Sequence, residues 1–239
     1  MTAVHRLALF LFSHRWLALV RWDFHLIRVR LVNALTGARQ RGRRFLATRN
    51  NPVYLNIGSG PRGKASQHWV NVDGYDDDNV HFRLDLSRPL LFPDNAFDGA
   101  FCEHVLEHFS FEDGHRVCSE IRRVLRPGGV FRIVVPDAER IVRTYFDDPD
   151  RLIAYRGLPD ATAMQVVNDF FRQRYEHQFL FDWQTLQKLL AESGFAEISL
   201  RAIGDGQCRD LLIDDEKYGW ESLYVEAVKP APSASDTGN

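Results

Sequence analysis

Val53-Tyr54-Leu55-Asn56-Ile57-Gly58-Ser59-Gly60 is the stretch that decides the fold. Its first five residues are mostly apolar and predict a short buried strand, and the glycines that follow predict a tight turn. Glycine permits backbone torsions and a close approach that a side chain would block. We therefore expect a ligand to lie against the end of this first strand.

Strands and helices alternate along the chain after this stretch. Further strands are expected at residues 69–73, 80–84, 97–101, 130–135, 198–203 and 223–228, and helices at residues 110–125, 137–146, 161–175 and 182–193. Alternation of this kind, with strands that are apolar on both faces, predicts a mostly parallel sheet. The fold class is therefore α/β: a Rossmann-like, mostly parallel seven-stranded sheet with helices on both faces, plus a basic helical extension at the N-terminus.

Charge divides the chain of 239 residues into unequal parts. Residues 1–50 hold ten Arg and one acid, about +9, so the net charge of −2 leaves about −11 for the rest. We expect a basic, partly amphipathic extension at 1–50, one domain at 51–229 and a disordered tail at 230–239. A basic arm favours contact with an anionic surface, whereas the acidic body argues against nucleic acid as the substrate.

The N-terminal extension has several interpretations. A helical region over residues 4–35 and a flexible basic linker over residues 39–49 are expected. The apolar run at residues 7–20 is too short to span a bilayer. The extension would contact a membrane peripherally, pack on its own domain or form an oligomer contact. Three scattered cysteines, with no C-x-x-C pair, indicate neither a disulfide framework nor a zinc site, and favour a cytoplasmic setting.

Acidic residues follow the other parallel strands. Ligands in such sheets bind at the carboxyl ends of the strands, so Asp73, Asp85 and Glu103 should lie near the glycine turn. Asp73 is suited to ribose hydroxyls, Asp85 to an exocyclic amine and Glu103 to an ammonium group. Asp85 would equally suit the turn that follows it, and Glu103 would equally suit a helix cap.

The glycine turn continues as Gly58-Ser59-Gly60-Pro61-Arg62-Gly63, which spells G-x-G-x-x-G. In dinucleotide sites this motif opens a helix, and the ribose-binding acid follows about 20 residues later. Here Asp73 follows Gly58 by 15 positions, with no room for a long helix between them. The spacing favours a single nucleoside, and an NAD-dependent enzyme is the weaker alternative.

The ordered motifs resemble those of class I methyltransferases that use S-adenosylmethionine (SAM), in particular the type 11 domain group. The matching segments are Leu55–Gly60, Val70–Asp73, Leu84–Leu86, Leu91–Asp98, Glu103–Phe109 and Glu120–Val130. This resemblance implies SAM as the cofactor. It implies cofactor contacts from Asn56, Gly58, Ser59, Gly60, Asp73, Asp85, Leu86 and Glu103.

A second resemblance concerns the acceptor. The segments His177–Asp182 and Glu221–Ala227 are similar to those of a subgroup associated with surface-glycan gene clusters. It implies a glycan or another small-molecule acceptor, methylated on oxygen. The alternative function is a non-catalytic binding module that keeps the SAM fold and acts through its N-terminal arm.

Three histidines are candidates for the proton acceptor that a hydroxyl nucleophile needs, namely His104, His108 and His177. His108 follows His104 by four positions and would share its face if the segment is helical. Each histidine would equally serve a structural or capping role. The spacing also resembles a metal-binding pair, but the sequence places no third ligand, so we expect no metal.

Overall fold

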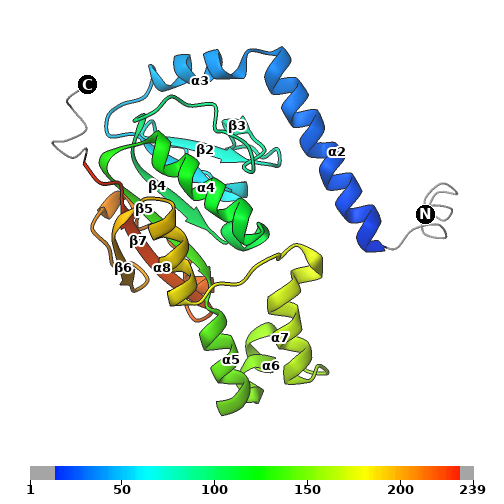
Figure 1. Ribbon diagram of the computed structural model, residues 1–239. Helices are drawn as coiled ribbons and strands as arrows, with labels where there is room; N and C mark the ends of the chain where they lie inside the picture. Colours follow the sequence, from blue (N-terminus) through cyan, green and yellow to red (C-terminus); the bar gives the residue numbers. More distant parts are fainter. Residues whose placement is uncertain (1–13, 232–239) are drawn as a thin grey trace, which may run out of the picture.

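The computed structural model describes residues 14–231 and contains one seven-stranded sheet (Figure 1). The strand order is β3-β2-β1-β4-β5-β7-β6. The strands are β1 (Tyr54–Ile57), β2 (Trp69–Asp73), β3 (Phe82–Arg83), β4 (Phe97–Glu103), β5 (Leu125–Pro136), β6 (Ala196–Arg201) and β7 (Ser222–Val228). The pairs among β1 to β5 are parallel and the pairs that β7 makes with β5 and β6 are antiparallel, which confirms the expected mostly parallel α/β sheet.

The strand order reverses at β1. The chain passes from β1 outward to β2 and β3, then returns to β4 on the other side. Ile57, at the end of β1, lies in register with Val72 of β2 and with Cys102 of β4. The segments after β1 and β4 therefore leave the sheet at the same edge, which is where open α/β sheets bind ligands.

The first face of the sheet is apolar and is covered by α4 (Phe111–Val124) and α8 (Trp183–Glu192) (Figure 1). The Ser110 hydroxyl caps α4 by accepting from the Asp113 N–H at 3.1 Å, as the sequence predicts. The helix ends at Val124, and the Pro127-Gly128-Gly129 turn lies inside the long strand β5 that follows.

The second face carries polar side chains. Arg132 of β5 is fully buried there, and its guanidinium pairs with Asp214 at 2.5 Å and with Glu226 at 3.3 Å. Residues 202–221 cover this face with two short 3₁₀ turns, η4 (Arg209–Leu211) and η5 (Glu216–Tyr218). The expected helical cover is thus reduced here to single turns, because this glycine-containing segment has no long apolar period.

Three helices pack together beyond the carboxyl edge of the sheet (Figure 1): α5 (Ala138–Asp147), α6 (Pro149–Arg156) and α7 (Ala163–Arg172). The sequence did not predict α6. Asp148 caps the start of α6 by accepting from the Arg151 N–H at 3.2 Å, and Gly157, with a φ of 63°, ends the helix. The helix expected over residues 161–175 is α7, which ends at Arg172. The 3₁₀ turn η3 (Gln173–Tyr175) follows it.

The N-terminal extension forms α2 (His14–Leu35) and α3 (Ala38–Leu46). The expected flexible linker over residues 39–49 is therefore wrong. Gly42 explains why: a side-chain carbon at this position would lie 3.5 Å from the Phe92 ring, so α3 packs on the domain through its glycine. Within residues 14–231, no helix is long and apolar enough to cross a membrane. The expectations for residues 4–13 and 232–239 lie outside the described residues.

Candidate active site

The turn after β1 is shaped for a close approach of a ligand to the backbone. Gly58 and Gly60 have φ angles of 63° and 47°, in the left-handed region that favours glycine. A side-chain carbon on Gly58 would clash with Val105, which follows β4. The Ser59 hydroxyl is buried and has no hydrogen-bond partner among the described residues. These features fit a cofactor held against the turn.

Asp73 connects the end of β2 to the glycine turn. One carboxylate oxygen accepts from the Gly60 N–H at 2.8 Å, and the other accepts from the Tyr75 N–H at 2.8 Å. The side chain is mostly buried. A carboxylate offers about four acceptor sites, so Asp73 retains capacity for the hydroxyls of a ribose.

Glu103, at the end of β4, meets a cation from its own chain. Arg62, in the 3₁₀ turn η1 (Gly60–Arg62), donates to Glu103 at 2.5 Å and to Asp215 at 2.8 Å. The Asp215 N–H also donates to Glu103 at 2.9 Å. The sequence predicted that Glu103 would meet the ammonium group of a ligand. In the structure the guanidinium of Arg62 lies beside it.

A cavity of about 600 Å³ lies beside this ion pair. Its lining joins the glycine turn, the ends of β1 and β4 and the segment before η5. The lining residues are Asn56, Gly58, Ser59, Arg62, Gly63, Lys64, Ala65, Phe101, Glu103, Ile213, Asp214, Asp215 and Glu216. Four of the expected cofactor residues therefore share one cavity: Asn56, Gly58, Ser59 and Glu103.

Asp85 and Leu86 lie farther along, after β3. One Asp85 oxygen accepts from Arg30 of α2 at 2.5 Å, and the other accepts from the N–H and hydroxyl of Ser87 at 3.0 and 2.7 Å. Leu86 packs against the main core. Asp85 thus caps its own turn, which was the alternative interpretation, and also anchors the N-terminal helix.

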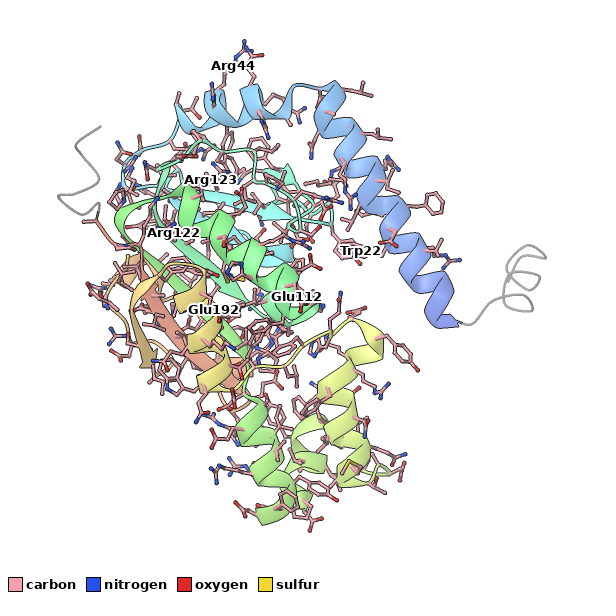
Figure 2. The ribbon with its side chains drawn as sticks, viewed as in Figure 1. Trp22, Arg44, Glu112, Arg122, Arg123 and Glu192 are labelled. Carbon is pink, nitrogen blue, oxygen red and sulfur yellow. The ribbon has the colours of Figure 1, made fainter. Side chains whose placement is uncertain are left out.

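Helix α2 packs along the β2–β3 edge of the domain (Figure 1). The Trp22 and Tyr75 rings lie 4.7 Å apart between centroids, and His25 Nε2 lies 2.7 Å from the Gly74 carbonyl. Figure 2 shows Trp22 on the side of α2 that faces the domain, whereas Arg44 of α3 points away from it. The extension is therefore part of the wall beside Asp73 and Asp85.

The three predicted histidines converge on Glu107, which sequence reasoning missed. His104 Nδ1 and His177 Nε2 lie 3.4 and 3.9 Å from one oxygen of the Glu107 carboxylate. The rings of His108 and His177 meet edge to face at a centroid distance of 5.0 Å. The segment is not α-helical: residues 106–108 form the 3₁₀ turn η2 (Leu106–His108).

Burial controls the charge of this cluster. Burial alone would raise the pKa of Glu107, but the three neighbouring imidazoles outweigh it and lower the pKa below the usual value. Burial also lowers the pKa of His177, against the opposing influence of Glu107. The structure therefore favours an ionised Glu107 beside a neutral His177.

Comparisons with known proteins agree with this geometry. Residues 55–133 match the family model of a methyltransferase domain. The sterol 24-C-methyltransferase of Yarrowia lipolytica is 32% identical over 96 residues, which is 40% of this chain and 22% of that protein. This chain therefore matches about a fifth of the length of its curated relative.

A solved structure shares the fold. It is the complex between the Haloferax volcanii Trm112 methyltransferase activator and a putative methyltransferase, with a TM-score of 0.50 and 17% identity, covering 82% of this chain and 93% of that chain. Residues 55–133 are thus similar to a methyltransferase domain, and the strand order and the glycine turn agree with that match. The cofactor of this domain is SAM.

Proposed function

We propose that this chain transfers the methyl group of SAM to a hydroxyl oxygen of a glycan or another small acceptor. In this reaction the oxygen attacks the methyl carbon, the carbon–sulfur bond breaks, and its electron pair remains on sulfur. The hydroxyl proton must pass to an acceptor, and neutral imidazole is suited to that step. The observation that carries the proposal is the convergence of His104, His108 and His177 just beyond β4.

The cofactor half of the proposal rests on the turn after β1. The backbone of Gly58 and Gly60, the unpartnered hydroxyl of Ser59 and the carboxylate of Asp73 are the groups that would hold SAM. Asn56 and Glu103 line the adjoining cavity. Asp85 and Leu86 remain candidates for the adenine side, on the sequence argument alone.

The acceptor half rests on the segment that begins at His177. The N–H groups of Gln178 and Phe179 donate to the Glu107 carbonyl at 2.8 and 3.1 Å, which ties this segment to η2. The same segment carries the resemblance to the surface-glycan subgroup. It therefore supports a glycan acceptor bound beside the histidines.

The direct test uses SAM with a labelled methyl group and an acceptor screen of surface-glycan fractions and small hydroxylated metabolites. We expect label on oxygen, identified by the methyl ether signal of the isolated product. Label on nitrogen or carbon would contradict the O-methyl proposal. SAM binding without any methylated product would favour the non-catalytic module.

The N-terminal extension supports a peripheral membrane contact at the cytoplasmic face. Four apolar side chains of α2 are exposed at helical spacing, from 44% to 85%: Phe24, Ile27, Leu31 and Leu35. They lie on a basic segment, and this combination suits anionic lipid headgroups. The opposite face of α2 packs on the domain through Leu26 and Val29, which are buried.

Vesicle sedimentation tests this contact. The full chain should sediment with vesicles of equal phosphatidylglycerol and phosphatidylcholine, and a triple variant Phe24→Ser, Leu31→Ser and Leu35→Ser should not. Phe146→Ser is the matched control, because Phe146 is 75% exposed but lies on α5. Equal sedimentation of the triple variant and the wild type would refute a membrane contact through α2.

A further inference from the structure

Glu107 is a buried carboxylate without conventional partners. Its side chain is fully buried, and neither oxygen accepts a hydrogen bond from any residue in the described part of the chain. His177 Nε2 is buried beside it and, within residues 14–231, likewise has no hydrogen-bond partner. Buried polar atoms left in this state are destabilising, so such a group indicates an unfilled site.

The tautomer of His177 places a second hydrogen-bond acceptor beside Glu107. His177 Nδ1 lies 2.7 Å from the Phe170 carbonyl, which can only accept, so Nδ1 carries the ring proton. Nε2 of the neutral ring then presents a lone pair, and it lies 3.9 Å from a Glu107 oxygen, another acceptor. Two acceptors that face each other across this distance would both be satisfied by a cation between them.

We propose that Glu107, His108 and His177 bind one divalent first-row transition-metal ion, such as Zn²⁺. One ligand atom from each of these residues lies within 4.8 Å of the other two. Tetrahedral ligands about 2.1 Å from Zn²⁺ are about 3.4 Å apart, so side-chain adjustments of about 1 Å would close the site. Two imidazole nitrogens and one carboxylate oxygen suit this class of metal better than Mg²⁺ or Ca²⁺.

Surrounding groups already hold the proposed ligands in place. Metal-binding histidines usually donate their second N–H to a carbonyl or carboxylate, as His177 does to Phe170. His104 Nδ1 lies 3.4 Å from a Glu107 oxygen without a hydrogen bond to it, and the His104 ring is oriented by the Ser222 hydroxyl, 2.9 Å from Nε2. The sequence excluded a metal because no third ligand was visible; the structure brings Glu107 and His177 to His108 and removes that reason.

Three protein ligands leave one tetrahedral position open, as in catalytic zinc sites. His108 is half-buried, so the open position can be reached from solvent. A hydroxyl bound there would lose its proton more readily, because the ion stabilises the alkoxide, and His104, which is not a proposed ligand, would accept that proton. This role rests on the proposed methyl transfer to oxygen, whereas metal binding itself does not.

The test measures metal binding without SAM or acceptor. The full chain is stripped with a chelator and titrated with Co²⁺, followed by its visible absorption, and with Zn²⁺, followed by calorimetry. We expect one ion per chain, and Glu107→Gln and His177→Gln should each bind about 100-fold more weakly. His115→Gln is the control and should bind like the wild type, because His115 belongs to α4 and not to the cluster.

Two results would overturn the proposal. One is a wild-type chain that binds no stoichiometric Co²⁺ or Zn²⁺; the other is wild-type affinity in both Glu107→Gln and His177→Gln. Circular dichroism checks the fold of each variant, and His108→Gln replaces any that does not fold, since this half-buried side chain tolerates change better. Metal binding without methyl transfer would refute the proposed function but not the metal site.

Discussion

The candidate site has two ends, a proposed cofactor end and a proposed acceptor end, and they are built from different parts of the chain. At the cofactor end, the backbone of Gly58 and Gly60 and one carboxylate, Asp73, come from a single short stretch. At the acceptor end, Glu107 and His108 come from the turn after β4, and His177 comes from a segment about 70 residues later. A site made of local backbone geometry is therefore visible in the sequence, whereas a site made of converging side chains is not.

The largest expected effect concerns the acceptor end. His177→Gln removes a buried ring of the cluster, so turnover should fall about 100-fold while SAM affinity changes by less than about 3-fold. Initial rates and calorimetric SAM titration measure the two quantities. His115→Gln serves as the control. A parallel loss of SAM affinity would show that the two ends form one site, and it would contradict the division of the site into a cofactor end and an acceptor end.

The next effect concerns the cofactor end. Asp73→Ala removes the proposed ribose acceptor and two hydrogen bonds to backbone N–H groups, so SAM should bind about 10- to 100-fold more weakly, or about 2 kcal/mol. Calorimetric titration measures the change. Asp94→Ala is the control, because Asp94 is exposed, pairs with Arg123 and is not among the proposed cofactor residues. Unchanged SAM affinity would show the ribose assignment to be wrong.

The two glycines of the turn should differ from each other. A methyl group on Gly58 would meet Val105, whereas one on Gly60 would meet no atom within 4 Å. Both substitutions share the cost of about 1 kcal/mol for the left-handed torsion. Gly58→Ala adds the clash with Val105, so we expect it to weaken SAM binding about 10-fold more than Gly60→Ala. Thermal unfolding monitors stability in parallel. Identical affinities would mean that the contact between the turns is unimportant for the cofactor.

The smallest effect separates two roles of Asp85. If Asp85 contacts adenine, Asp85→Ala should weaken SAM binding about 5-fold, whereas Arg30→Met should leave it nearly unchanged. The Arg30 side chain is 38% exposed, so loss of the ion pair should cost about 1 kcal/mol of stability or less. Equal SAM affinity in both variants would confine Asp85 to anchoring α2.

Much of the fold could be predicted because it is encoded locally. Alternating apolar runs predicted the sheet, and the helices expected from residues 110 and 137 do begin there, capped by Ser110 and Asp137. Helix α3 was missed because its Arg-rich sequence resembles a linker, whereas in the structure it packs on the domain through Gly42, Phe45 and Leu46. Helix α6 has clear caps but a weak apolar pattern.

The site was less accessible to sequence reasoning. The glycine turn and Asp73 were found from spacing and from the ends of strands. Arg30 and Arg62 were not, because their partners lie 55 and 41 residues away in the chain. Glu107 was overlooked because a glutamate in a polar-looking segment is usually exposed. Its spacing from His104 and His108 was the available signal.

A calorimetric titration of the full chain with SAM, S-adenosylhomocysteine and NAD measures directly which cofactor the glycine turn binds. The glycine turn with its nearby Asp73 predicts that both SAM and S-adenosylhomocysteine bind one per chain, and that NAD does not. Absence of SAM and S-adenosylhomocysteine binding at about 500 μM would contradict the account, because it would correspond to affinity weaker than about −4.5 kcal/mol.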